Sequence, residues 1–168
     1  AHGSPLFVYD TGIVRERLAR LRAALPDACE IHFAIKANPL PEFLAVVAPL
    51  VGGLDVASGG ELAKALTVKD AAQISFAGPG KREAELEAAI AAGATLNLES
   101  EGEAERALTI GRRLGVTPRL AVRVNPDFEL RGSGMKMGGR ASPFGVDVAR
   151  VPALVNRLIA AGADWQGF

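Results

Sequence analysis

The chain has 168 residues, 19 basic and 19 acidic side chains, a formal net charge of zero and 49% hydrophobic residues. The balanced charge argues against a nucleic-acid-binding surface and a polybasic membrane patch, and no apolar run approaches the roughly 20 residues of a membrane span. The single cysteine, Cys29, excludes an internal disulfide framework and suits a reducing compartment. We therefore expect a cytoplasmic protein in which Cys29 is a small, at least half-buried residue.

Short apolar runs alternate with segments of helical periodicity along most of the chain. The sequence predicts a short strand at residues 6–9, followed by a helix that Asp10 or Thr11 caps and Pro26 ends. From residue 30 onward it predicts six strands separated by five helical segments. The strands are expected at residues 30–36, 54–57, 74–77, 95–98, 119–124 and 163–168, and the helices at residues 41–51, from 58, 82–92, from 100 to about 115, and 148–161.

Two of the predicted helices begin with a serine that a glutamate follows three residues later. Ser58 with Glu61, and Ser100 with Glu103, are expected to form capping boxes, which satisfy free backbone N–H groups reciprocally. Glu99 precedes the second serine, and we expect it to serve the cap or the helix dipole. These polar residues are therefore assigned to helix starts rather than to chemistry.

The alternation of strands and helices predicts an α/β fold with parallel strands, because a helical segment separates each strand from the next. An open doubly wound sheet and a (β/α)8 TIM-type barrel both fit. The barrel is favoured because no Gly-x-Gly-x-x-Gly motif follows the first strand and because polar residues stand at several strand ends. A complete barrel needs eight strands and about 250 residues. We therefore expect residues 11–168 to be the N-terminal portion of a barrel, truncated at its C-terminus and poorly stable alone because its sheet edges are open.

Lys36 ends the apolar run that begins at Ile31, and Asn38-Pro39 follows as a turn signal. The lysine should lie at the C-terminal end of a strand, which is the edge of a parallel sheet where active sites form. A partly desolvated lysine is more readily neutral, and a neutral amine can form a Schiff base with an aldehyde. The alternative is a structural lysine that extends from the strand end into water.

Asp55 and Arg123 also lie at predicted strand ends, so a barrel would bring them to the same rim as Lys36. Asp55 could orient the lysine and tune its charge, or it could cap the next helix. Arg123 could bind a phosphate, a carboxylate or Asp55 itself, or it could form a buried structural ion pair. His32 alternates with Phe33, and we expect it to be structural or to face the helices. No grouping of His, Cys and carboxylates has metal-ligand spacing.

A long loop from residue 125 to about residue 143 carries Arg131, Lys136 and Arg140 among glycines. A loop of this length inside a compact barrel is usually functional. The alternative is a surface insertion without a role in the site.

Two stretches of the sequence form specific motifs: residues 33–39, Phe-Ala-Ile-Lys-Ala-Asn-Pro, and residues 55–62, Asp-Val-Ala-Ser-Gly-Gly-Glu-Leu. At this spacing they resemble the lysine motif and the second motif of the fold-type III pyridoxal-phosphate-dependent decarboxylases, the family of diaminopimelate, ornithine and arginine decarboxylases. Residues 3–10, 98–100 and 120–126 resemble its first segment and two later strands, so the resemblance covers nearly the whole chain.

The resemblance implies an alanine-racemase-like barrel and a pyridoxal-phosphate-dependent amino-acid decarboxylase that acts on diaminopimelate or another basic or diamino acid. It implies that Lys36 is the catalytic residue and holds the cofactor as a Schiff base, and that Asp55 and Arg123 belong to the cofactor's surroundings. It further implies a homodimer, and it assigns residues 1–10 to a second β domain. We expect residues 1–168 alone to be inactive. Two alternatives stay open: an amino-acid racemase on the same barrel, and a non-catalytic homologue that binds the cofactor or regulates a partner.

The long loop departs from the family pattern. Residues 134–139 and 144–147 resemble the diaminopimelate-decarboxylase-like branch that is associated with exosortase systems. The family commonly has Lys-Phe-Gly in this loop, whereas Pro143 precedes Phe144 here, so no role is transferred to Lys136. The family's cofactor-stacking histidine, its phosphate site and the acid at the pyridine nitrogen are expected beyond the residues of this chain.

Overall fold

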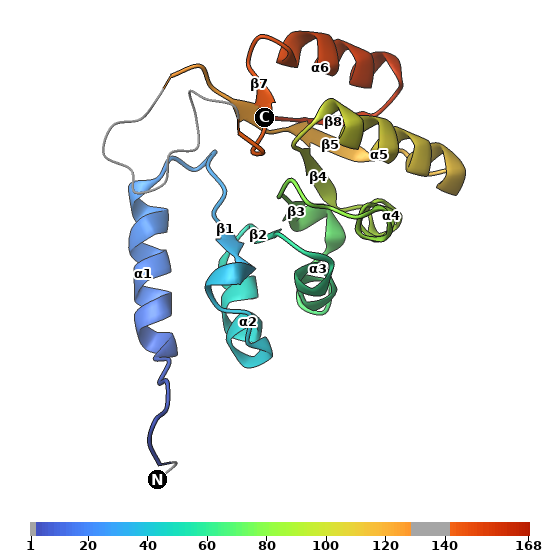
Figure 1. Ribbon diagram of the computed structural model, residues 1–168. Coiled ribbons are helices and arrows are strands. Elements are labelled where there is room, and N and C mark those ends of the chain that lie inside the picture. The colour runs from blue at the N-terminus through green and yellow to red at the C-terminus, as the bar shows by residue number, and fades with distance from the viewer. Residues whose placement is uncertain (1–2, 129–141) are drawn as a thin grey trace.

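Six parallel strands form one sheet in the computed structural model, which describes residues 3–128 and 142–168 (Figure 1). The strand order is β1-β2-β3-β4-β5-β8, so each strand of the sheet lies beside the one that precedes it in the chain. In a doubly wound sheet the strand order would reverse at a switch point, and the order of this sheet does not reverse. The predicted barrel, of which these strands form one part of the wall, is therefore confirmed. The strands are β1 (His32–Ala34), β2 (Gly53–Val56), β3 (Ile74–Phe76), β4 (Thr95–Leu98), β5 (Arg119–Val122) and β8 (Asp164–Gly167), while β6 (Val124–Asn125) and β7 (Val146–Asp147) form a separate parallel pair.

The helices α2 to α6 follow one another along one side of the sheet, and α1 lies beside α2 (Figure 1). In the described part of the chain, no helix combines the length and the apolar character that crossing a bilayer requires. The helices are α1 (Thr11–Ala24), α2 (Pro41–Val47), α3 (Gly59–Ala65), α4 (Glu83–Ala92), α5 (Glu101–Leu114) and α6 (Val151–Ala160), with short 3-10 turns η1 (Ile35–Ala37), η2 (Ala48–Leu50) and η3 (Ala71–Gln73).

The hydrophobic core lies between the sheet and these helices. Alternate strand side chains enter it, because successive side chains of a strand point to opposite faces, and helix residues such as Leu86 complete it. The intervening positions of β2, β3 and β4 carry Asp55, Ser75 and Asn97, which are half-buried. One face of the sheet is thus apolar and covered, and the other is a polar wall. The buried strand residues are Leu54, Val56, Ile74, Phe76, Leu96, Leu98, Leu120 and Val122.

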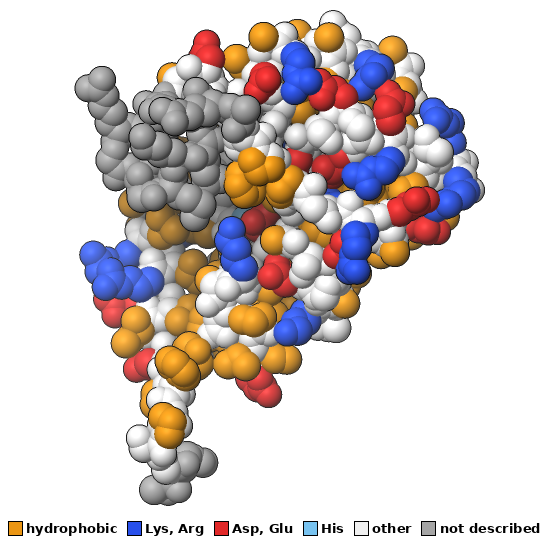
Figure 2. Space-filling view, viewed as in Figure 1, with side chains coloured by type: hydrophobic (Ala, Val, Ile, Leu, Met, Phe, Trp, Pro, Cys, Tyr) orange, Lys and Arg blue, Asp and Glu red, His pale blue; other side chains and the backbone are white. Residues whose placement is uncertain are grey.

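The segment before α1 differs from its prediction. Residues 6–9 form no strand with any described part of the chain, so the predicted short strand is wrong. Their apolar side chains are exposed, with Phe7 88% exposed, and apolar atoms are visible along this segment in Figure 2. The cap of α1 is as predicted, since the Asp10 carboxylate accepts a hydrogen bond from the Gly12 N–H at 2.7 Å. The assignment of residues 1–10 to a second domain stays a prediction.

Two local predictions around β1 need correction. Cys29 is exposed rather than half-buried. The Arg22 guanidinium binds the backbone carbonyls of Cys29 and Pro26, so this loop is held by its backbone and the thiol stays outside the core. The strand predicted at residues 30–36 is shorter in the structure, where it is β1. Lys36 lies in η1, the 3-10 turn that directly follows this strand.

Both predicted capping boxes form only in part. The Ser58 and Ser100 hydroxyls accept hydrogen bonds from the N–H groups of Glu61 and Glu103, each at 3.2 Å. The glutamate carboxylates, however, accept from the residue before the serine: Glu61 from the Ala57 N–H at 2.8 Å, and Glu103 from the N–H of the residue before Ser100 at 3.2 Å. Each glutamate therefore ties the strand end, rather than the cap itself, to the helix.

Glu85 joins the N-termini of α3 and α4. Its carboxylate accepts hydrogen bonds from the backbone N–H groups of Arg82 (2.9 Å) and Gly59 (2.7 Å), which lower the pKa of Glu85 from 4.5 to about 2. Glu85→Gln is expected to lower the unfolding free energy at neutral pH by about 1–2 kcal/mol, because it removes a charged acceptor. A lowered carboxyl pKa contributes stability that is present above the usual pKa and lost as the pH falls.

The difference between wild type and Glu85→Gln should therefore shrink as the pH falls from 4.5 towards 2, measured by urea unfolding at a series of pH values. Glu87→Gln is the control in the same helix, because the Glu87 carboxylate makes only an exposed ion pair with Arg113 at 2.9 Å. A Glu85→Gln effect that is constant with pH would contradict the prediction.

Candidate functional site

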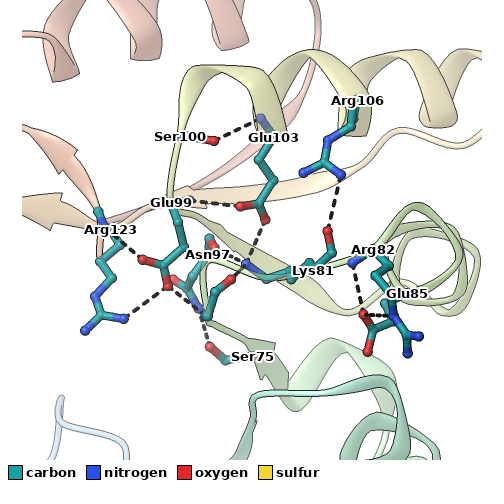
Figure 3. Close-up of polar contacts among 12 residues, drawn as sticks. Ser75, Lys81, Arg82, Glu85, Asn97, Glu99, Ser100, Glu103, Arg106 and Arg123 are labelled. Carbon is teal, nitrogen blue, oxygen red and sulfur yellow. Dashed lines mark hydrogen bonds and ion pairs between the residues drawn. The ribbon is translucent and has the colours of Figure 1, made fainter. Parts of the chain in front are cut away.

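The polar wall contains a chain of hydrogen bonds that crosses three strands. Asp55 pairs with Ser75 in the register of β2 and β3, and the Ser75 hydroxyl binds the Asp55 carboxylate. The Asn97 amide of β4 donates to the Ser75 oxygen at 2.5 Å, as Figure 3 shows. The Ser75 side chain in turn lowers the pKa of the Asp55 carboxyl. The chain therefore runs from Asn97 to the Asp55 carboxylate.

Lys36 and Asp55 lie near enough for the lysine charge to act on the carboxyl, although no ion pair or hydrogen bond joins them in the described part of the chain. Ala34, two residues before Lys36, pairs with Asp55 across β1 and β2. Burial raises the pKa of Asp55, while the positive charge of Lys36 and the hydrogen bond from Ser75 act against that rise. The Lys36 side chain is exposed, so the expected partial desolvation of its amine is not found in this structure.

Arg123 and Glu99 form an ion pair where β4 and β5 end (Figure 3). Nη1 of Arg123 donates to Oε1 of Glu99 at 3.1 Å, and the guanidinium lies 5.0 Å from the centre of the Phe144 ring. Of the alternatives for Arg123, the structure shows the structural ion pair, with Glu99 as the partner; within the described chain Arg123 makes no hydrogen bond to Asp55. The Arg123 side chain keeps 31% of its surface exposed, so the pair is buried on the glutamate side alone.

Glu99 has a different role from the predicted one. Its side chain is 1% exposed and accepts hydrogen bonds from the N–H groups of Gly78 (2.7 Å) and Gly145 (2.8 Å), besides Arg123. The carboxylate does not cap α5, since Ser100 does so. The available signal was a carboxylate directly after one strand and a glycine, Gly78, shortly after the preceding strand. The adjacent Ser-x-x-Glu pattern obscured this signal.

Lys81 is a buried residue that the sequence did not indicate. Its ammonium donates to Oε1 of Glu103 at 2.7 Å, and both side chains are 1% exposed. It also donates to the carbonyls of Gly78 (2.7 Å) and Asn97 (2.8 Å). Lys81 follows Gly-Pro-Gly, which is typical of an exposed turn, and lysine is rarely buried without a partner. Its role is structural, because its donors are bound within the protein.

His32 faces the polar wall rather than the helices, so of its two predicted alternatives the helix-facing one is wrong, and a structural role stays a prediction. A Cβ atom added to Gly53 would lie 2.6 Å from Nε2 of His32, so the imidazole covers that glycine on the Asp55 face. Phe33 takes the helix side, where its ring packs 5.8 Å from that of Phe43. The larger apolar side chain enters the core, and alternation leaves His32 on the opposite face. Arg131, Lys136 and Arg140 lie outside the described residues.

The arrangement offers three chemical functions at one end of the sheet. Lys36 supplies an accessible primary amine, which can bind a carbonyl group covalently. Asp55 supplies a carboxyl whose pKa is raised by burial, beside that amine. Arg123 supplies a fixed cation that can bind a phosphate or a carboxylate.

Residues 11–162 match the family described as "Pyridoxal-dependent decarboxylase, pyridoxal binding domain". The chain belongs to this decarboxylase family. It is 37% identical to the diaminopimelate decarboxylase of Neisseria meningitidis serogroup A over 153 residues, which cover 89% of the chain and 38% of that protein. It is 32% identical to a 2-[(L-alanin-3-ylcarbamoyl)methyl]-2-hydroxybutanedioate decarboxylase of Staphylococcus aureus over 155 residues, which cover 92% of the chain and 39% of that protein.

Among solved structures, a diaminopimelate decarboxylase of Helicobacter pylori complexed with L-lysine superposes with a TM-score of 0.89 at 26% identity. The match covers 99% of the chain and 43% of that structure, and the six parallel strands correspond to the N-terminal part of the decarboxylase barrel domain. The chain thus spans less than half the length of these decarboxylases. The predicted family and fold are confirmed.

Proposed function

We propose that the protein is a pyridoxal-phosphate-dependent decarboxylase of a basic or diamino amino acid such as diaminopimelate. The observation that carries the proposal is the accessible Lys36 amine beside Asp55 at the C-terminal ends of β1 and β2, in a chain of the pyridoxal-dependent decarboxylase family. The donor set fits the cofactor: an amine suits its aldehyde, and a cation and a carboxyl suit its polar groups.

In this proposal Lys36 would hold the cofactor covalently through its Nζ atom, and after the substrate has displaced it the free amine would carry protons at the reacting carbon. Asp55 would fix the position of the amine and moderate its charge. Arg123 would bind an anionic group of the cofactor or the substrate. When bound, the cofactor supplies an electron sink for the bond that breaks as the α-carboxylate leaves as CO2.

The substrate class rests on the relatives rather than on a pocket in this chain. The Neisseria relative is named for diaminopimelate, but the Staphylococcus relative, at comparable identity, is named for a different compound. A panel of amino acids with CO2 release as the readout would identify the substrate. The homodimer, the cytoplasmic location and the exosortase-associated branch stay predictions.

The central test is chemical labelling of the protein at its natural length. Pyridoxal phosphate is added, the adduct is reduced with borohydride, and the modified peptide is identified by mass spectrometry. We expect the label on Lys36. A label on another lysine, or none, would contradict the proposal. A racemase would label Lys36 but convert one enantiomer of its amino acid into the other without CO2, and a non-catalytic homologue would label Lys36 without turning over any amino acid.

Ser75→Ala tests the chain of hydrogen bonds that ends at Asp55. The substitution removes a bond that lowers the pKa of Asp55, so that pKa should rise further above its usual value of 3.8. If Asp55 acts as a carboxylate, the acidic limb of the pH–activity profile moves to higher pH, and carboxyl NMR titration should show the same direction. Thr95→Ala is the control, because Thr95 lies on the same face but contacts Arg119 instead. An unmoved Asp55 titration in Ser75→Ala would refute the assignment.

A further inference from the structure

Glu99 binds three segments that are far apart in the sequence. Its Oε1 accepts from the Gly78 N–H after β3 and from Arg123 after β5, and its Oε2 accepts from the Gly145 N–H before β7. The side chain is 1% exposed. A buried carboxylate with both oxygens bound is held in one orientation, because moving it would leave two backbone N–H groups unsatisfied.

Both the guanidinium and the backbone of Arg123 are held in place by hydrogen bonds. Its guanidinium is bound by Glu99, and its backbone carbonyl accepts a hydrogen bond from the Val146 N–H at 2.8 Å. Gly145 packs against it so closely that an added Cβ would lie 2.8 Å from the Arg123 carbonyl oxygen, and its φ of +83° also favours glycine. The part of Arg123 that stays exposed, 31% of its side chain, is therefore presented in a fixed place at the end of the sheet.

We propose that Glu99 is a positioning residue that fixes Arg123 for binding an anionic group of a ligand at this end of the sheet. The inference rests on the proposed function, because the anion is either the carboxylate of the amino acid or the phosphate of pyridoxal phosphate. In the second case Arg123 would bind the phosphate in addition to the phosphate site that is expected outside these residues. An arginine that has lost its carboxylate partner samples many rotamers, and ordering it again on binding costs affinity. Glu99 acts through Arg123 and does not itself touch the ligand.

The test compares Glu99→Gln with Glu85→Gln in the protein at its natural length. Glu85 is a matched control, because its carboxylate also accepts from two backbone N–H groups and from an arginine side chain, Arg82, at 3.2 Å, but does not contact Arg123. We expect Glu99→Gln to weaken anion binding about tenfold, the loss of a charge-assisted bond that holds Arg123. Glu85→Gln should leave binding within about twofold while lowering stability.

Three ligand measurements separate the two possible anions. The dissociation constants of pyridoxal phosphate and of pyridoxal are measured by absorbance titration, and KM and kcat are measured for the amino-acid substrate. A weaker affinity for pyridoxal phosphate but not for pyridoxal assigns Arg123 to the phosphate. A raised KM with unchanged cofactor affinity assigns it to the substrate carboxylate. The losses of anion affinity in Arg123→Lys and in Glu99→Gln should not add up in the double variant, because both changes disturb the same contact.

The outcomes distinguish the two proposals. Suppose that wild type is labelled on Lys36, but that Glu99→Gln binds pyridoxal phosphate and the amino acid as well as Glu85→Gln does. The positioning role is then wrong. Faster amide exchange at Gly78 and Gly145 in that case would show that Glu99 serves only to hold the loops together. If wild type is not labelled on Lys36, the proposed function fails, and the positioning role fails with it.

Discussion

Replacing Lys36 by alanine is expected to lower the decarboxylation rate of the protein at its natural length by at least about 10³-fold. The change removes the amine that would hold the cofactor in place, and a positioned covalent nucleophile accounts for that much rate enhancement or more. Turnover is measured as CO2 release from the substrate that the amino-acid panel identifies. The Lys36 side chain is exposed, so the substitution should leave the folded structure intact.

Two further variants show whether the effect belongs to the amine itself. Lys36→Arg keeps a positive charge beside Asp55 but removes the nucleophile, and it should be almost as inactive as Lys36→Ala. Lys64→Ala removes another exposed lysine, whose ammonium donates to the Pro39 carbonyl at 3.3 Å, and it should retain activity. Decarboxylation that persists in Lys36→Ala would show that the reaction does not depend on this lysine.

The fold was largely predictable because its signals are local and repeat along the chain. Apolar runs such as residues 95–98 stand between turn glycines and Ser-x-x-Glu helix starts, and this alternation permits only parallel strands. The order of the strands in the sheet distinguishes a barrel from a doubly wound sheet. This order depends on tertiary contacts, so only the structure could give it. Residues 6–9 have strand composition, but no strand partner for them lies in the described chain, and a strand forms only where such a partner exists.

The placement of candidate site residues was predictable where it follows from a position at a strand end. Lys36 and Asp55 lie together because neighbouring parallel strands end at the same edge of the sheet. The roles of Glu99 and Lys81 depend on which loops approach one another, and no local pattern carries that information. Lys81 in particular stands in a turn sequence, and its burial becomes favourable only because Glu103, 22 residues away, supplies a carboxylate.

Replacing Lys81 by methionine has the largest expected effect on stability. The three N–H donors of its ammonium bind Glu103 and the carbonyls of Gly78 and Asn97 at 2.7 to 2.8 Å. Lys81→Met would leave the Glu103 carboxylate buried and unpaired, and we expect the unfolding free energy to fall by about 3–5 kcal/mol. Urea unfolding measures the loss.

Lys69→Met is the matched control. The Lys69 ammonium also donates to two carbonyls, those of Ala48 (2.8 Å) and Val51 (2.7 Å), but to no carboxylate. Its loss should cost only about 1–2 kcal/mol. Replacing Glu103 by leucine in the Lys81→Met background should restore part of the stability, because no buried charge then remains. Equal losses for the two single lysine variants would contradict the role of the buried pair.

The Lys81–Glu103 pair also supports the candidate site. Lys81 binds the Asn97 carbonyl, and Oε2 of Glu103 accepts from the Glu99 N–H at 3.2 Å, so the pair fixes the backbone on both sides of Leu98 where β4 ends. From this backbone the Asn97 side chain reaches towards Asp55 and the Glu99 side chain reaches Arg123. Lys81→Met should therefore accelerate amide exchange at Gly78, whose N–H binds Glu99, more than Lys69→Met does. Unchanged exchange there, together with a loss of global stability, would mean that the pair stabilises the core without positioning the site.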